Sequence, residues 1–131
     1  MKSIVVTPDA PKAVGPYSQA VLVGDTLYCS GQIPLDPASG EVVVGGVREQ
    51  ADRVFQNLRA VLHAAAMEFS DVIKTTIFTT DLSRFAELNE VYSSYFSEPY
   101  PARSTVEVSA LPRGVQVEVE LVAIRSRESV A

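Results

Sequence analysis

The strongest hydrophobic pattern in the chain lies between Val47 and Met67. Apolar side chains recur there at helical spacing, and a polar stripe of arginine, aspartate, glutamine and histidine residues occupies the opposite side. This pattern predicts an amphipathic helix that packs on a core. The predicted core positions are Val47, Ala51, Val54, Phe55, Leu58, Val61, Leu62 and Ala65.

Shorter β-prone runs flank this helix, and a second helix is predicted later in the chain. That helix begins at a cap supplied by Asp81 or Ser83, runs to about Phe96 and is ended by Pro99 and Pro101. Its aromatic stripe is interpreted as core. The predicted strands are Ser3–Thr7, Ser18–Val23, Thr26–Ser30, Asp71–Thr80, Arg103–Val108 and Val115–Arg125. The order predicts one α+β domain over residues 1–131, with two helices on one face of a single sheet.

The last two strands alternate between valine and polar residues, which predicts an antiparallel hairpin. A turn at Ala110–Gly114 places Thr105 opposite Glu118 and Arg103 opposite Glu120, on the face turned away from the helices. Glu120 is interpreted as structural, as an ion-pair partner that orients Arg103.

Val122 and Ile124 continue this second face, and their apolar character predicts a partner surface. In such a desolvated interface Arg103 is expected to bind a carboxylate in bidentate fashion. Glu118 is expected to take a proton from water.

Composition narrows the classes of protein further. The chain has 131 residues and a net charge of −5, which argues against a nucleic-acid binder. Cys29 and His63 are the only residues of their types, so neither an internal disulfide nor a Cys/His zinc site is expected. Cys29 is expected to be a buried thiol and His63 a surface residue. No apolar run approaches the roughly 18 residues of a membrane span, and the cytosol is the expected compartment.

Several short motifs occur together between about Pro8 and Arg125. The most specific pieces are Pro101-Ala102-Arg103-Ser104-Thr105-Val106-Glu107-Val108, Leu111-Pro112 and Val117-Glu118-Val119-Glu120. The supporting pieces are Ala13-Val14-Gly15-Pro16-Tyr17-Ser18, Ser30-Gly31-Gln32-Ile33-Pro34, Lys74-Thr75-Thr76 and Leu88-Asn89. In this order and at these spacings the motifs resemble one family, the reactive-intermediate deaminases of the RidA or YjgF type. The resemblance implies a chorismate-mutase-like subunit, a homotrimer and sites in the clefts between subunits.

The resemblance also implies an activity that needs neither metal nor organic cofactor. Relatives of the arginine-bearing type hydrolyse 2-iminopropanoate and 2-iminobutanoate to 2-oxo acids and ammonia. Arg103 would hold the substrate carboxylate and Glu118 would activate water. The further binding residues that the resemblance implies are Tyr17, Ser30, Gly31, Asn89 and Thr105.

Two positions depart from the family pattern. Thr105 stands where many relatives have cysteine, so thiol chemistry is absent there. Ala66 stands where relatives often end the first helix with glycine, which affects helix termination.

Other functions fit the same residues less well. A trimeric regulatory or chaperone-like protein that binds small carboxylates without turnover would use Arg103 but would need no base at Glu118. A ribonuclease is disfavoured by the acidic balance. A chorismate mutase would need more cationic groups than the sequence places near Arg103.

Overall fold

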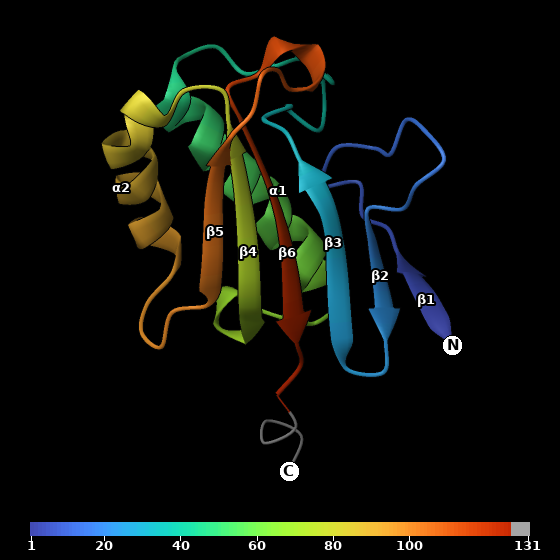
Figure 1. Cartoon of the computed structure of the whole chain (residues 1–131). Coiled ribbons are helices and arrows are strands. Elements are labelled where there is room, and N and C mark those ends of the chain that lie inside the picture. The colour runs from blue at the N-terminus through green and yellow to red at the C-terminus, as the bar shows by residue number, and fades with distance from the viewer. Residues whose placement is uncertain (127–131) are drawn as a thin grey trace.

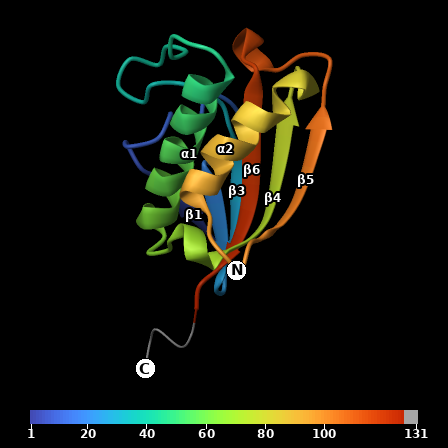
Figure 2. The ribbon, with the colours of Figure 1, turned by 90° about the vertical axis from the view of Figure 1, so that its left-hand side faces the viewer.

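The architecture of the chain is one six-stranded sheet with two helices on one of its faces (Figures 1 and 2). The computed structural model describes residues 1–126. The elements are β1 (Lys2–Val5), β2 (Ala20–Val23), β3 (Thr26–Gln32), α1 (Val47–Ala64), β4 (Val72–Thr79), α2 (Phe85–Tyr95), β5 (Ala102–Glu107) and β6 (Val117–Ile124). This confirms the predicted α+β class. No helix within the described residues is long and apolar enough to cross a membrane.

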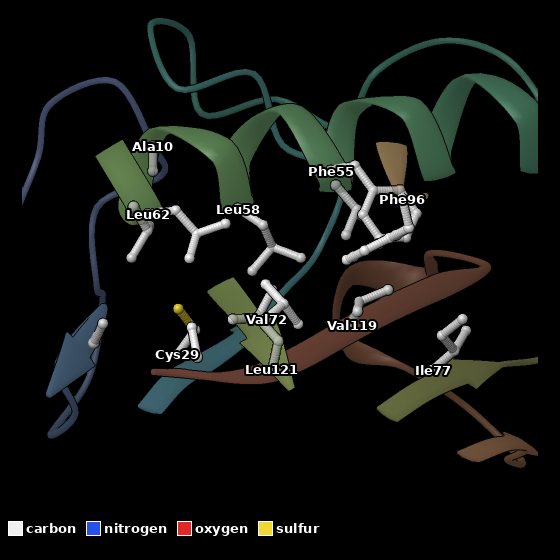
Figure 3. Packing of buried hydrophobic residues seen from close by; sticks show 14 of the residues in the cluster. Ala10, Cys29, Phe55, Leu58, Leu62, Val72, Ile77, Phe96, Val119 and Leu121 are labelled. Atoms are coloured by element: carbon white, nitrogen blue, oxygen red, sulfur yellow. The ribbon is translucent and has the colours of Figure 1, made fainter. Parts of the chain in front are cut away.

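The core lies between α1 and the sheet. Every apolar position predicted for this helix is buried, and Leu58 and Leu62 are fully so. Figure 3 shows their side chains pointing from α1 toward the sheet, where Cys29, Val72 and Leu121 lie. Burying a leucine side chain stabilises the fold by about 1.5–3 kcal/mol, so this one interface fixes the helix on the sheet.

Helix α1 ends at Ala64, three residues before the predicted end. The chain turns at Ala66, whose φ is +58°, and the amide of Met67 donates to the carbonyl of Leu62 at 2.9 Å. A left-handed residue at this point terminates the helix, which is the usual role of a glycine. Here an alanine occupies the position and bears the steric cost of a Cβ.

The predicted hairpin between the last two strands is wrong. The strand order is β1-β2-β3-β6-β4-β5, so β4 lies between β5 and β6. Strand β5 pairs with β4 in parallel, and β6 pairs antiparallel with both β4 and β3. The reason is the β4–α2–β5 connection, a helical crossover that returns the chain parallel to β4 on the sheet edge.

This strand order also overturns the prediction that Arg103, Thr105 and Glu118 share one face of the sheet. Arg103 is in register with Thr75, and Thr105 with Ile77, both of which are buried beneath the helices. Glu118 is in register with Phe78 and alternates with the buried Val119 along β6. Arg103 and Thr105 therefore lie on the helix-covered face of the sheet, and Glu118 lies on the open face.

The open face carries apolar side chains, as the sequence predicted for Val122 and Ile124. Val122 is partly buried, and Ile124 is 43% exposed. Tyr28 and Val106 lie on the same face and are 53% and 42% exposed.

The interpretations of Cys29 and His63 are confirmed: the thiol is buried, which raises its pKa to about 12, and the imidazole is on the surface.

Candidate functional site

The first half of the candidate site is a cavity of about 390 Å³ between α2 and β5, the Arg103 pocket. Its lining residues are Asn89, Tyr92, Ser93, Tyr100, Pro101 and Arg103. Nη1 of Arg103 donates to Oδ1 of Asn89 at 2.8 Å. The guanidinium carbon lies 4.7 Å from the ring centroid of Tyr92 and 5.4 Å from that of Phe85. Within residues 1–126, Arg103 makes no ion pair with a carboxylate.

Helix α2 supplies this support because Phe85, Asn89 and Tyr92 follow one another at intervals of four and three residues and so share a face. The hydroxyl of Tyr92 lies 3.0 Å from Oγ1 of the buried Thr75. Burial raises the pKa of Tyr92, while its bond to Thr75 and the charge of Arg103 oppose that rise. The tyrosine thus presents a fixed aromatic face to the guanidinium.

The second half is a cavity of about 620 Å³ at the other face of the sheet, the Glu118 pocket. Its lining residues are Pro11, Lys12, Val14, Tyr17, Gln19, Ser30, Gly31, Gln32, Ile33, Leu35, Pro112, Arg113 and Glu118. Burial raises the pKa of Glu118, and the nearby charge of Glu120 adds to the rise. A carboxylate with a raised pKa is a stronger proton acceptor than one in water.

Gly31 allows the Glu118 carboxylate to lie against the backbone of β3. A Cβ built on Gly31 would stand 2.3 Å from Oε2 and 2.9 Å from Cδ of Glu118. The register between β3 and β6 shifts between Cys29 and Gln32, which marks a β-bulge at Ser30 and Gly31. Bulges redirect the chain next to functional sites, and here the bulge opens room for a carboxylate.

Ser30 and Tyr17 complete this pocket in different ways. Oγ of Ser30 donates to the carbonyl of Ser18 at 2.6 Å, and its amide donates to the carbonyl of Gln19 at 3.0 Å. The hydroxyl of Ser30 is therefore bonded to the backbone at Ser18, the residue that follows Tyr17. Tyr17 is 53% exposed, and its hydroxyl oxygen accepts from the amide of Val14 at 3.4 Å.

The structure thus groups the sequence-predicted residues into two sets. Asn89 and Arg103 share the first pocket, and Tyr17, Ser30, Gly31 and Glu118 share the second. Thr105 lies two residues beyond Arg103 on the same face, and its buried hydroxyl has no hydrogen-bond partner in the described structure.

The expectation that Glu120 orients Arg103 is wrong, because Glu120 lies on the open face of the sheet. Asn89 and the aromatic rings of α2 orient the guanidinium instead.

The sequence interpretation took Tyr92 for a core residue alone, although its spacing from Asn89 indicated a shared face. It also passed over Lys12 and Arg113. Among residues 1–126, no group of three or more histidine, cysteine, aspartate or glutamate side chains could hold a metal ion.

The fold and the two pockets define a small α+β protein with an arginine and a carboxylate on opposite faces of its sheet. The chain belongs to the family described as endoribonuclease L-PSP, the RidA/YjgF family, whose model matches residues 7–125.

Relatives carry names of two kinds. A human protein named 2-iminobutanoate/2-iminopropanoate deaminase is 46% identical over 125 residues, which cover 95% of this chain and 91% of the human one. Relatives from Pyrococcus carry only the family name RutC.

Solved structures agree with the fold. RidA from an Antarctic Psychrobacter is 48% identical with a TM-score of 0.91, over 94% of this chain and 99% of that one. Escherichia coli TdcF with bound serine is 44% identical with a TM-score of 0.89, over 95% of this chain and 99% of that one.

Proposed function

We propose that the protein hydrolyses small 2-imino acids, with 2-iminopropanoate and 2-iminobutanoate as the substrate class, to 2-oxo acids and ammonia. One observation carries the proposal. The Arg103 guanidinium is held by an amide and two aromatic rings, faces a cavity and has no carboxylate partner in the described residues. Such a planar fork fits a ligand carboxylate. The name of the human relative and the serine bound to TdcF, itself a small carboxylate, support this chemistry.

The proposal includes a site built from two copies of the chain. Arg103 and Glu118 lie on opposite faces of one sheet, so one chain cannot hold a molecule of four carbons between them. A neighbouring copy in a homotrimer supplies the missing half when its Arg103 pocket meets the Glu118 pocket. The exposed apolar residues of the open face, Tyr28, Val106 and Ile124, suit such a contact.

The chemistry needs an oriented imine, a water molecule and a proton acceptor. Arg103 binds the carboxylate and leaves the adjacent C=N carbon accessible. Glu118 accepts a proton from water as the water oxygen bonds to that carbon, and the C=N π electrons move to the nitrogen, which takes a proton from solvent. Protonated Glu118 then returns its proton to the amine nitrogen of the carbinolamine. The C–N bond breaks and ammonia leaves, while the hydroxyl loses its proton to solvent and the C=O bond forms. General base catalysis of this kind contributes about 10²–10⁴ in rate.

The first experiment measures imine hydrolysis directly. An amino-acid oxidase generates the imine, semicarbazide traps it, and a hydrolase lowers the trapped fraction. We expect the wild-type protein to lower the trapped fraction of imine and the Arg103→Ala variant to leave that fraction unchanged. Arg48→Ala is the matched control, because Arg48 is paired with Glu90 on the surface at 2.8 Å. An inactive wild-type protein would refute the proposal.

A second pair of variants separates turnover from binding. Glu118→Gln is expected to lower kcat by about 10²–10⁴, the contribution of a general base, and to keep the affinity for a stable carboxylate such as serine, measured by calorimetry. Glu120→Gln, two residues along the same strand and exposed, is the control and is expected to remain active. Binding by the wild-type protein without any hydrolysis would assign the chain to the carboxylate-binding module instead.

A mixing experiment tests whether two copies build the site. Chains that carry Arg103→Ala are unfolded together with chains that carry Glu118→Gln, and the mixture is refolded. Some interfaces then combine an intact Arg103 from one copy with an intact Glu118 from the other. Random assembly in a cyclic oligomer restores about a quarter of the wild-type activity. No recovery from correctly assembled mixtures would contradict the divided site.

A further inference from the structure

Residues 7–18 form one wall of the Glu118 pocket and are called the strap below. Pro11, Lys12, Val14 and Tyr17 of the strap line the pocket. The strap contains no helix or strand, and in Figure 1 it extends beyond the ends of β1 and β2 beside the end of β3. Because its backbone groups lack the partners that a sheet or helix provides, other bonds must hold the strap in place.

Gln19, the residue before β2, supplies these bonds. The residue is 4% exposed. Its Oε1 accepts from the amide of Thr7 at 2.7 Å. Its Nε2 donates to the carbonyls of Thr7 at 3.1 Å, Ala10 at 3.3 Å and Pro11 at 2.8 Å. A side-chain amide suits this place because it both accepts and donates without a charge.

We propose that Gln19 is a positioning residue for the Glu118 pocket, which acts by holding the strap against the sheet. It bonds the first part of the strap, and Ser30 bonds its last residue through the carbonyl of Ser18. Lys12 and Tyr17 lie between these two attachments and depend on both. Glu118 lies on β6 and owes its place to the sheet rather than to the strap.

Trypsin tests the attachment without reference to any activity. Cleavage after Lys12 reports local opening of the strap, and cleavage after Lys74, in strand β4 between β6 and β5, reports global unfolding. When opening is fast, the rate of cleavage follows the open population. We expect Gln19→Met to speed cleavage after Lys12 at least about tenfold, because losing one hydrogen bond changes an equilibrium about fivefold. Cleavage after Lys74 is expected to change much less.

The control is Gln50→Met, which removes another buried amide. Gln50 is 6% exposed, and its Oε1 accepts from the amide of Gln116 at 2.8 Å, away from the strap. Gln19→Glu serves if Gln19→Met does not fold, since it keeps the acceptor for Thr7 and loses the donors to the three carbonyls. Equal acceleration after Lys12 and Lys74, or the same effect from Gln50→Met, would overturn the proposal.

A kinetic measurement connects the strap to the pocket and rests on the proposed function. Gln19→Met is expected to raise KM about tenfold with kcat within about twofold, because the strap forms the binding wall while the base stays in place. A fall in kcat with KM unchanged would overturn the positioning role. If the wild-type protein hydrolyses no imine, the proposed function fails, and the cleavage experiment still decides the role of Gln19.

Discussion

Gly31→Ala offers the sharpest perturbation of the candidate base. The added Cβ would stand 2.3 Å from Oε2 of Glu118, where ordinary contact begins at 3.4 Å, so the carboxylate must move by about 1 Å. The obstacle is the far end of a flexible side chain, and Gly31 does not have a left-handed φ. The fold can therefore accept the methyl group. Replacing glycine at a compatible position stabilises a protein by about 0.4–1 kcal/mol through the unfolded state.

Activity and stability are thus expected to change in opposite directions. A displacement of about 1 Å in a reacting group can cost about 10²-fold in rate. We expect kcat of Gly31→Ala to fall by about that factor while the midpoint of thermal unfolding stays equal or rises. Gly46→Ala is the control, because its Cβ would approach only one atom, Oε1 of Glu49, at 3.9 Å.

A double variant identifies the cause of the loss. If Gly31→Ala acts by moving Glu118, it should cost nothing further in a chain that already carries Glu118→Gln, since coupled changes are not additive. Steady-state kinetics of the four proteins measures this coupling. Full activity in Gly31→Ala, or an independent loss in the double variant, would refute the placement of the base.

Three further predictions concern stability. Glu118→Gln should raise the free energy of unfolding at pH 7, because burial and Glu120 raise the folded-state pKa of Glu118 above its ordinary value and its charge therefore destabilises the fold. That gain should disappear in urea unfolding below about pH 4, where the folded and unfolded chains both hold the proton. Ala66→Gly should stabilise the chain by about 1 kcal/mol, because φ is +58° there; an unchanged urea midpoint would contradict the strained turn. Thr105→Val should stabilise it by about 1 kcal/mol and keep activity, because the buried hydroxyl has no partner in the described structure; a loss of hydrolysis would give that hydroxyl a role in the reaction.

The sequence predicted the first helix well and the sheet edge badly, for physical reasons. Along α1 a period of 3.6 residues identifies one buried face, and every predicted core position is buried. Along β5 and β6 apolar and polar residues alternate with a period of two, and this alternation is the same whichever strand lies alongside. It therefore could not distinguish pairing of each strand with β4 from a hairpin between β5 and β6. The helix between β4 and β5 was the available signal, because such a crossover returns the strand parallel to the first.

The candidate site was predictable in its members and not in its arrangement. The motifs around Tyr17, Ser30, Arg103 and Glu118 named residues that do line pockets. The wrong strand pairing then placed Arg103 and Glu118 together on one face. The support of Arg103 by Tyr92 was hidden for another reason: a buried aromatic residue on a helix is typical of a core, and only the structure shows what its ring faces.

The placement of Arg103 and Glu118 on opposite faces of the sheet has a consequence for how the protein behaves in a cell. Under the proposed divided site, catalytic capacity depends on the chain's concentration as well as its amount. Specific activity should then drop on dilution below the dissociation constant for self-association, and a newly made chain should remain inactive until it meets others. Under the same proposal, substitutions at subunit contacts tune or silence the activity without altering any residue that touches the ligand.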